Sequence, residues 1–313
     1  MLFPFRSVLV LSLLWGASVS GEELFRDLSL EGGFNLSAVT STSTPLELGP
    51  ILVQTPDTQP QWRLAQWGTR FNLMDATPTV SEQGDRGVAN AGKAVVIHNG
   101  GLGGEGVTLT VLGGAEYGGA LRKQGELWPH LLVEQAFTEA FRFTDFSRLD
   151  FALDFKVVRC TLATEKEVRK DLHTGQITAF FSVHNKNRES TDFNDMIWFG
   201  LPIFDVRFEL PNGHQAVDRG KDDATGKFIC TLPGSQFYEA PTGDGKWHAL
   251  RGDLVPLMTE ALAASQAKGF LKDTKLGDLL PSSFNLGWEV PGPYDCEITL
   301  KGLSLNGVRA DKG

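Results

Sequence analysis

The sequence predicts an all-β protein, an antiparallel β-sandwich of the jelly-roll type with one covering α-helix. Three observations indicate this: repeated segments of alternating apolar and polar residues, turn dipeptides between them, and 35 glycines in 313 residues. Alternation with period two is typical of strands that bury one face. Abundant glycine is typical of the tight turns that join strands. A single helical segment among many strands favours a sandwich over a layered α/β fold.

The N-terminus carries the pattern of an export signal. An apolar run and a group of small residues follow Arg6, so residues 1–21 are predicted to be a signal peptide. A retained N-terminal anchor is the alternative. The expected location is secreted, periplasmic or at the cell surface. We expect an irregular arm over 22–60 with at most one short strand, one β-sandwich domain over 61–308 and a short tail over 309–313.

The charge balance narrows the choice of partners. Removing Arg6 with the signal leaves 28 basic against 38 acidic residues, and no basic run occurs. An acidic surface repels phosphate backbones and anionic lipids. We therefore expect no nucleic acid partner and no membrane association after signal cleavage. Neutral glycans are favoured over polyanionic ones.

Strand-like segments follow one another along most of the chain. Leu149, Phe151, Leu153 and Phe155 alternate with polar residues and define one buried face. Turn signals such as Asn99-Gly100 separate such segments. In chain order the predicted strands are 62–67, 69–73, 94–98, 107–112, 128–137, 149–162, 176–185, 192–207 with its continuation to 210, 227–232, 283–290 and 294–305.

One segment, 253–268, has the spacing of a helix. Asp253 is a suitable N-cap, apolar residues recur from Leu254 to Leu262 at intervals of three and four, and Gly269 is a suitable stop. We expect this helix to cover one end of the sandwich.

Three cysteines, Cys160, Cys230 and Cys296, lie too far apart in sequence for a local metal knuckle. Export would permit one disulfide with one thiol left over. Three buried thiols acting as small apolar side chains are the alternative. The sequence does not choose between these readings or assign the partners.

No cofactor and no metal site are predicted, because the six histidines lack metal-ligand spacing. A weaker alternative is a Ca²⁺ loop, since Asp218, Asp222 and Asp223 precede Gly226.

The stretch 192–207 combines a strong strand signal with unusual polar residues. Alternation places Asp192, Asn194 and Trp198 on one face, as in the floor of a cleft. The same alternation directs Asp195 toward the core, where a carboxylate needs a partner. Either a bulge turns Asp195 into the cleft, or Arg207, Arg219 or a backbone donor meets it.

A second polar group lies near the C-terminus. Glu289 shares a strand face with Asn285 and Gly287, and the glycine leaves room for something to approach. A carboxyl group beside aromatic side chains can act as a general acid. A surface glutamate before a turn is the alternative.

Trp128, His130 and Glu134 share one face of another strand and would line the same cleft. Tryptophan beside polar groups suits stacking on a sugar ring, although Trp128 packing in the core is the alternative.

Two of these segments resemble motifs of glycoside hydrolase family 12. That family carries Glu-x-Met-Ile-Trp on the nucleophile strand and Gly-x-Glu-x-x-Gly around the acid/base, and this chain has Asn194-Asp-Met-Ile-Trp198 and Gly287-Trp-Glu-Val-Pro-Gly292. The wider strand pattern is similar to the concanavalin A-like lectin and glucanase superfamily. The resemblance implies a glycoside hydrolase or a binding module. Asn194 stands at the nucleophile position, where an amide cannot form a glycosyl ester.

The resulting hypothesis is an exported β-sandwich that acts on a neutral polysaccharide with paired carboxylates. Glu289 would protonate the glycosidic oxygen, and Asp192 or Asp195 would be the second carboxylate, with a separation near 5 Å implying retention and roughly 6.5–9.5 Å inversion. Non-catalytic binding by Trp198, Asn194, Trp128, His130 and Glu134, or a purely structural role, is the alternative.

Overall fold

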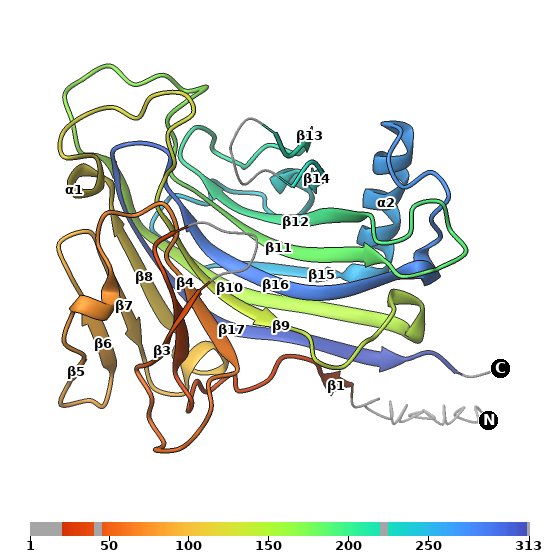
Figure 1. Cartoon of the computed structure of the whole chain (residues 1–313), viewed down its shortest axis with the longest axis horizontal. Coiled ribbons are helices and arrows are strands. Elements are labelled where there is room, and N and C mark those ends of the chain that lie inside the picture. The colour runs from red at the N-terminus through yellow and green to blue at the C-terminus, as the bar shows by residue number, and fades with distance from the viewer. Residues whose placement is uncertain (1–20, 41–45, 220–224, 312–313) are drawn as a thin grey trace, which may run out of the picture.

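The computed structural model describes residues 21–40, 46–219 and 225–311. It consists of two β-sheets packed face to face. The predicted signal peptide over 1–21 lies outside these residues except for Gly21. Figure 1 shows the two layers, with the long strands β10, β11, β16 and β17 running through the middle of the molecule.

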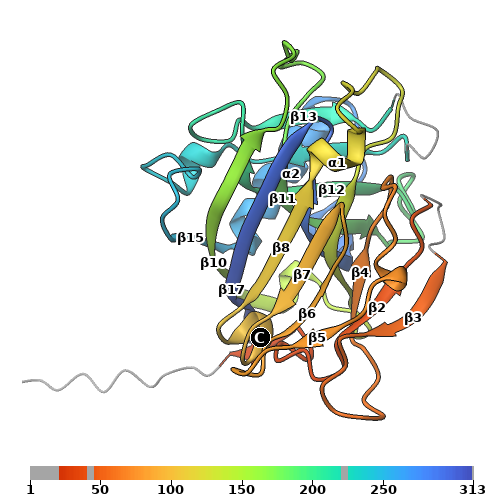
Figure 2. The same cartoon turned by 90° about the vertical axis from the view of Figure 1, so that its left-hand side faces the viewer.

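The first sheet, sheet A, has eight strands. Figure 2 shows most of them side by side. The order is β15 (His248–Asp253), β10 (Phe146–Leu162), β17 (Tyr294–Arg309), β8 (Val107–Leu112), β7 (Lys93–Ile97), β6 (Arg86–Ala89) and β5 (Thr79–Val80), and β1 (Glu22–Glu23) also pairs with β17.

The second sheet, sheet B, has nine strands. Their order is β13 (His214–Val217), β14 (Phe228–Thr231), β12 (Met196–Asp205), β11 (Gln176–Asn185), β16 (Leu279–Glu289), β9 (His130–Ala136), β4 (Trp62–Ala65), β2 (Phe34–Ser37) and β3 (Glu47–Ile51).

The predicted jelly-roll sandwich is confirmed. Its strand pairs are antiparallel except for β12 with β14 and β2 with β4, which run parallel. Residues 22–60 differ from the irregular arm that we predicted, because they supply β1, β2 and β3. The reason is local: Phe34 and Leu36 are buried on either side of Asn35, as in a half-buried strand.

Aromatic side chains join the two sheets. Phe151 of sheet A packs edge-to-face on Phe181 of sheet B, with ring centroids 5.8 Å apart. Phe181 in turn lies 5.0 Å from Phe284. All three rings are almost fully buried, so they form the centre of one core shared by both sheets.

The predicted helix is also confirmed, as α2 (Leu254–Ala267). The Asp253 side chain accepts a hydrogen bond from the Val255 backbone N–H at 3.1 Å and caps the first turn. Leu254, Met258 and Ala261 are buried against the sandwich. The helix contacts β10 and β15 of sheet A and β12 and β14 of sheet B, so it covers the gap between the two sheets on that side (Figure 1).

The remaining helices are single turns that join strands. They are η1 (Leu73–Asp75), η2 (Gly101–Gly103), α1 (Gly113–Tyr117), η3 (Phe143–Asp145), η4 (Gly234–Gln236) and η5 (Leu276–Asp278). Over the ranges that the structure describes, none of the helices has the length and apolar character needed to cross a membrane.

Candidate functional site

The face of sheet B that points away from sheet A carries the candidate site, and we call it the outer face. On β12, Ile197 and Phe199 are fully buried in the core whereas Trp198 between them is half-buried. Residues that lie opposite one another on neighbouring strands point to the same face of the sheet. The strand pairing therefore extends this assignment from β12 to β11, β16 and β9. The outer face comprises Met196, Trp198, Gly200, Pro202, Asp205, Gln176, Thr178, Phe180, Ser182, His184, Ser283, Asn285, Gly287, Glu289, His130, Leu132 and Glu134.

The strand β12 begins later than the sequence predicted. Residues 192–195 form a turn, in which the Asp195 N–H donates to the Asp192 carbonyl at 2.9 Å. Asn194 adopts the left-handed conformation with φ +64°, which asparagine tolerates better than most residues. The predicted alternation therefore holds from Met196 onward, and it is wrong for Asp192, Asn194 and Asp195.

Each of these three polar side chains binds a partner from another segment of the chain. Asp192 accepts hydrogen bonds from the Asp273 N–H at 2.7 Å and from the Thr274 hydroxyl at 3.0 Å. The Asn194 amide oxygen accepts from the Lys186 ammonium group at 3.1 Å.

Asp195 forms an ion pair with Lys227 at 2.8 Å, and a third of its side chain is exposed. It therefore does not point into the core. The cation that meets it is Lys227, at the surface rather than in a buried position, whereas Arg207 pairs with Asp205.

The turn lies far from Glu289. The Asn185 N–H donates to the Asp195 carbonyl, whereas Gln176, at the other end of β11, lies opposite Glu289. Nine residues of strand separate these two points, which corresponds to about 30 Å. The structure therefore does not bring Asp192 or Asp195 together with Glu289, and the two segments that resemble family 12 motifs lie at opposite ends of the sheet.

Glu289, on β16, belongs to a row of polar side chains across the outer face. It lies between Gln176 of β11 and His130 of β9. The Gln176 amide donates to its carboxylate at 3.1 Å, and His130 Nε2 lies 3.9 Å from the other carboxylate oxygen. About a quarter of the Glu289 side chain is exposed. It is thus accessible to a ligand and held in place by a neighbour from β11.

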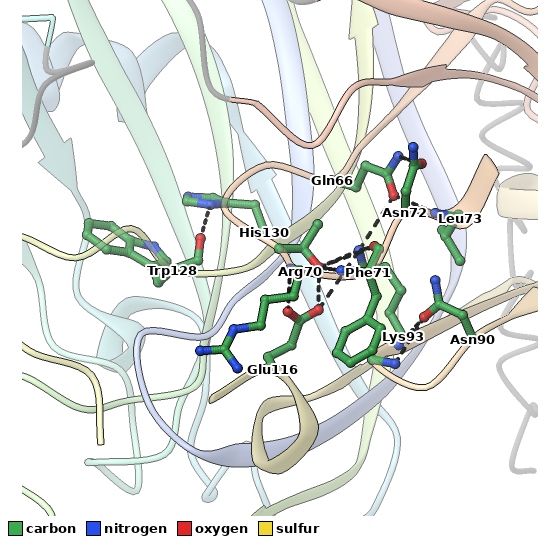
Figure 3. A network of polar contacts seen from close by, with 12 residues as sticks. Gln66, Arg70, Phe71, Asn72, Leu73, Asn90, Lys93, Glu116, Trp128 and His130 are labelled. Atoms are coloured by element: carbon green, nitrogen blue, oxygen red, sulfur yellow. Dashed lines mark hydrogen bonds and ion pairs between the residues drawn. The ribbon is translucent and has the colours of Figure 1, made fainter. Parts of the chain in front are cut away.

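His130 is oriented by the tryptophan that precedes it. Its Nδ1 donates to the Trp128 carbonyl at 2.9 Å, and the two rings stack with centroids 5.6 Å apart (Figure 3). Because a carbonyl only accepts, Nδ1 carries a proton, so Nε2 faces Glu289 without a proton in the neutral ring. Protonation of His130 would turn this contact into an ion pair.

Asp205 is a second carboxylate at the level of Glu289. It lies opposite Gln176 on the other side of β11, so its Cα is two strand spacings, about 10 Å, from that of Glu289. Arg207 binds it through Nε at 2.9 Å and Nη2 at 2.5 Å, and the Thr174 hydroxyl donates at 2.8 Å. Arg207 also donates to Gln176 at 3.3 Å.

Sequence reasoning missed Gln176, considered Arg207 only as a partner of Asp195, and gave Asp205 no role. Each comes from a different part of the chain from Glu289, so only the register of three strands brings them together. In the sequence, each of these residues is only a polar residue near the end of a strand. That feature is too common to identify a site.

Glu134, in the middle of the outer face, forms a buried ion pair with Arg63 and is not an accessible carboxylate in a cleft. Arg63 donates to it through Nε at 2.6 Å, and the Glu134 side chain is only 7% exposed. Burial raises the pKa of Glu134, and the neighbouring guanidinium of Arg63 opposes this shift. Its position on the same face as His130 agrees with the prediction from alternation.

The other end of the outer face is aromatic. Trp198 meets Phe180 edge-to-face with centroids 6.3 Å apart, and its indole N–H donates to the Thr225 hydroxyl at 3.2 Å. Ser182 lies opposite Trp198 on β11, and the hydroxyl of Ser283 donates to that of Ser182 at 3.1 Å. We call Trp198 and Phe180 with these hydroxyl groups the aromatic platform.

His184 lies next to the aromatic platform. Burial is the main cause that lowers its pKa, and the charges of Lys186 and Lys227 lower it further. Its imidazole is therefore neutral around pH 7, where it both donates and accepts hydrogen bonds.

Gly287 has a different role from the one predicted. A Cβ atom built on it would lie 2.1 Å from the Leu131 carbonyl oxygen, and its φ is +154°. The space that its missing side chain leaves is therefore occupied by the backbone of β9, and it provides no room for a ligand.

A buried polar network supports the loop beside His130. Lys93 is fully buried and donates to the Thr69 hydroxyl at 2.6 Å and to the Phe71 carbonyl, while Glu116 lies 3.9 Å away (Figure 3). Thr69 donates in turn to Glu116. The same loop carries Trp67, whose ring lies 6.0 Å from that of His130.

No metal centre is found among the described residues, since none of their His, Cys, Asp and Glu side chains form a group of three or more suitable for an ion. Of the predicted Ca²⁺ loop, Asp222 and Asp223 lie outside the described residues. Asp218 accepts hydrogen bonds from the Thr225 backbone N–H at 2.7 Å and from its hydroxyl at 2.8 Å.

No protein-family model matches the chain, and no curated protein sequence matches it. Solved structures do resemble it. A family 12 xyloglucanase from Bacillus licheniformis has a TM-score of 0.40 at 9% identity, covering 73% of this chain and 96% of that one. The family 11 xylanase from Neocallimastix patriciarum has a TM-score of 0.38 at 9% identity, covering 77% and 98%.

A third similar structure is the xyloglucanase domain of NopAA, a type three effector from Sinorhizobium fredii, in complex with cellobiose. Its TM-score is 0.38 at 9% identity, and the match covers 76% of this chain and all of that one. The similarity of these structures to the chain concerns the jelly-roll fold alone.

Proposed function

We propose that this chain is an exported β-sandwich that binds a neutral polysaccharide on the outer face of sheet B. The observation that carries the proposal is the aromatic platform. Trp198 is half-buried, so part of its side chain is accessible while its N–H donates to Thr225. Sugar rings present C–H groups on their faces and hydroxyls around their edges. An aromatic face flanked by hydroxyls complements both.

The electrostatics of the chain support a neutral ligand. The formal net charge is −9, which disfavours polyanionic chains. The neutral His184 and the hydroxyls of Ser182 and Ser283 supply hydrogen bonds without charge.

Retention of the protein in native gels that contain soluble glucan, xylan or mannan tests the proposal. We expect retention by at least one of these polymers, and about a tenfold weaker affinity in Trp198→Ala, because loss of one stacking contact amounts to roughly 1.4 kcal/mol. Trp247→Ala is the matched control. Trp247 is 45% exposed, and the Lys301 ammonium lies 4.2 Å above its ring on sheet A.

Retention by none of the three polymers, or equal loss in the Trp198→Ala and Trp247→Ala variants, would contradict the proposal.

A second candidate function, glycoside hydrolysis, rests on the positions of Asp205 and Glu289, which lie on either side of Gln176. Glu289 would act as the general acid and Asp205 as the base. A Cα separation of about 10 Å suits carboxyl groups with a water between them, which is the arrangement of inverting enzymes. The close pairing of Asp205 with Arg207 weighs against this role, because that carboxylate is already neutralised.

A reducing-sugar assay on the same three polymers tests hydrolysis separately from binding. Hydrolysis predicts release by the wild type and a loss of at least a hundredfold in Glu289→Gln, since an amide cannot donate the proton. Binding without release would leave the main proposal standing and reject this second one.

A further inference from the structure

Two of the three cysteines face each other across neighbouring strands. Cys160 on β10 and Cys296 on β17 are directly opposite in the antiparallel register, and their sulfur atoms are 3.1 Å apart. Opposed residues in such a ladder have Cα atoms about 4.5–5.5 Å apart, which lies inside the range of disulfide-bonded cysteines. The backbone therefore needs no rearrangement to accept a covalent bond.

We propose that Cys160 and Cys296 form a cross-strand disulfide, with Cys230 left as the free thiol. The three cysteines are thiols in this structure. Cys230 lies on β14 of sheet B, whereas the other two lie on sheet A, so the fold separates it from them. This assignment does not depend on the proposed glycan binding.

The surroundings of the pair fit a bond at this place. Gly175 passes over both sulfur atoms, and a Cβ built on it would lie 2.8 Å from each of them. The residue covering the pair therefore has no side chain to clash with it. The two neighbours of Gly175 are Thr174, which binds Asp205, and Gln176, which binds Glu289. The bond would link β10 to β17 of sheet A next to the segment that carries Thr174 and Gln176.

The two thiols differ in access, which sets the order of the reaction. Cys296 is fully buried, and burial raises its pKa. Cys160 is partly exposed and lines an open cavity of approximately 380 Å³ beside Phe204 and Arg207. Cys160 is therefore the thiol that an oxidant reaches first.

The oxidant is a small disulfide such as oxidised glutathione. The Cys160 thiolate attacks one of its sulfurs, forming a mixed disulfide and releasing one glutathione thiolate. The Cys296 thiolate then attacks the Cys160 sulfur, forming the protein disulfide and releasing the second glutathione. Two electrons pass from the protein thiols to the oxidant, and the two thiol protons pass to the released glutathione molecules.

The test counts thiols in the full chain after reduction and after incubation with oxidised glutathione. All three cysteines should titrate in the unfolded reduced protein, and one after oxidation. Cys230→Ser should still oxidise, with two thiols before oxidation and none after it. Cys160→Ser should keep two thiols under both conditions. Peptide mapping of the oxidised wild type without reductant should join the Cys160 and Cys296 peptides, and it does not depend on the folding of any variant.

Thermal unfolding gives a second measure. The bond would join residues 136 positions apart, a long loop whose closure restricts the unfolded chain. Oxidation should raise the midpoint of the wild type by about 5 °C or more and leave Cys160→Ser unchanged. Three thiols after oxidation, a link that contains Cys230, or a link between two chains would overturn the assignment.

Discussion

Lys93 shows how a single residue can decide the pH response of the molecule. Its ammonium group is completely buried between the sheets, and its hydrogen bonds go to Thr69, Phe71 and Gln66. Desolvation lowers the pKa of Lys93 to about 8, although the charge of Glu116 acts in the opposite direction. The cost of the buried charge is therefore only partly offset.

The first prediction concerns stability in alkali. Below pH 8 both folded and unfolded chains hold the Lys93 proton. Between pH 8 and about 10.5 only the unfolded chain holds it, so the free energy of unfolding contributed by this group rises with pH, by up to about 3 kcal/mol. Urea unfolding of the wild type and Lys93→Met at several pH values measures the difference.

The comparison of two proteins matters here because buried thiols titrate in the same range. Burial raises the pKa of Cys230 to about 11, and this group lowers stability between pH 9 and 11 in both proteins. The difference between wild type and Lys93→Met isolates the lysine. A difference that stays constant from pH 7.5 to pH 10 would show that Lys93 does not titrate in the folded state.

A second residue-scale prediction separates a structural from a functional role for Asp192. Its carboxylate holds the backbone at Asp273 and the hydroxyl of Thr274. Asp192→Ala should lower the free energy of unfolding by about 1–3 kcal/mol, because the buried Thr274 and the backbone N–H of Asp273 lose their acceptor. It should leave retention on polysaccharides unchanged. A stable variant with impaired retention would restore the functional role that the sequence suggested.

At the scale of elements, the start of β12 explains most of the difference between the predicted and the observed site. The residues before Met196 alternate in a way that fits a strand, yet Asn194 takes the left-handed conformation and the chain turns. Hydrogen bonds to Lys186 and Asp273, which belong to other segments, stabilise this turn. Local alternation does not contain that information.

The pairing of β16 with β9 gives the third prediction. Gly287 lies so close to the Leu131 carbonyl that Gly287→Ala should destabilise the fold by about 2–4 kcal/mol, since the strands would have to separate. Gly277→Ala is the matched control, because the nearest atoms to a Cβ there lie 3.6 Å away on Thr144, an ordinary contact. Chemical denaturation of both variants measures the effect. Equal stability of the Gly287→Ala and Gly277→Ala variants would show that the backbone of β9 leaves room for a side chain at position 287.

Across the whole molecule, the architecture could be predicted from the sequence because each long strand buries one face. The periodicity of β10 and the capped helix α2 are local patterns, and both were found. Short edge strands such as β5 and β13 were missed, since two to four residues carry too little pattern. The lateral order of strands was also missed. The set Asp205, Gln176 and Glu289 exists only through that order.

The proposed glycan binding depends on Trp198 on the outer face, and an NMR titration can follow this side chain individually. The indole N–H signals of the seven tryptophans can be followed while cellohexaose, xylohexaose or mannohexaose is added, with Trp198→Phe identifying its signal. Binding on the aromatic platform predicts that the Trp198 signal shifts most, because its N–H lies at the edge of the stacked ring. A saturable shift confined to Trp247, or no shift with any of the three sugars, would rule out glycan binding on the aromatic platform.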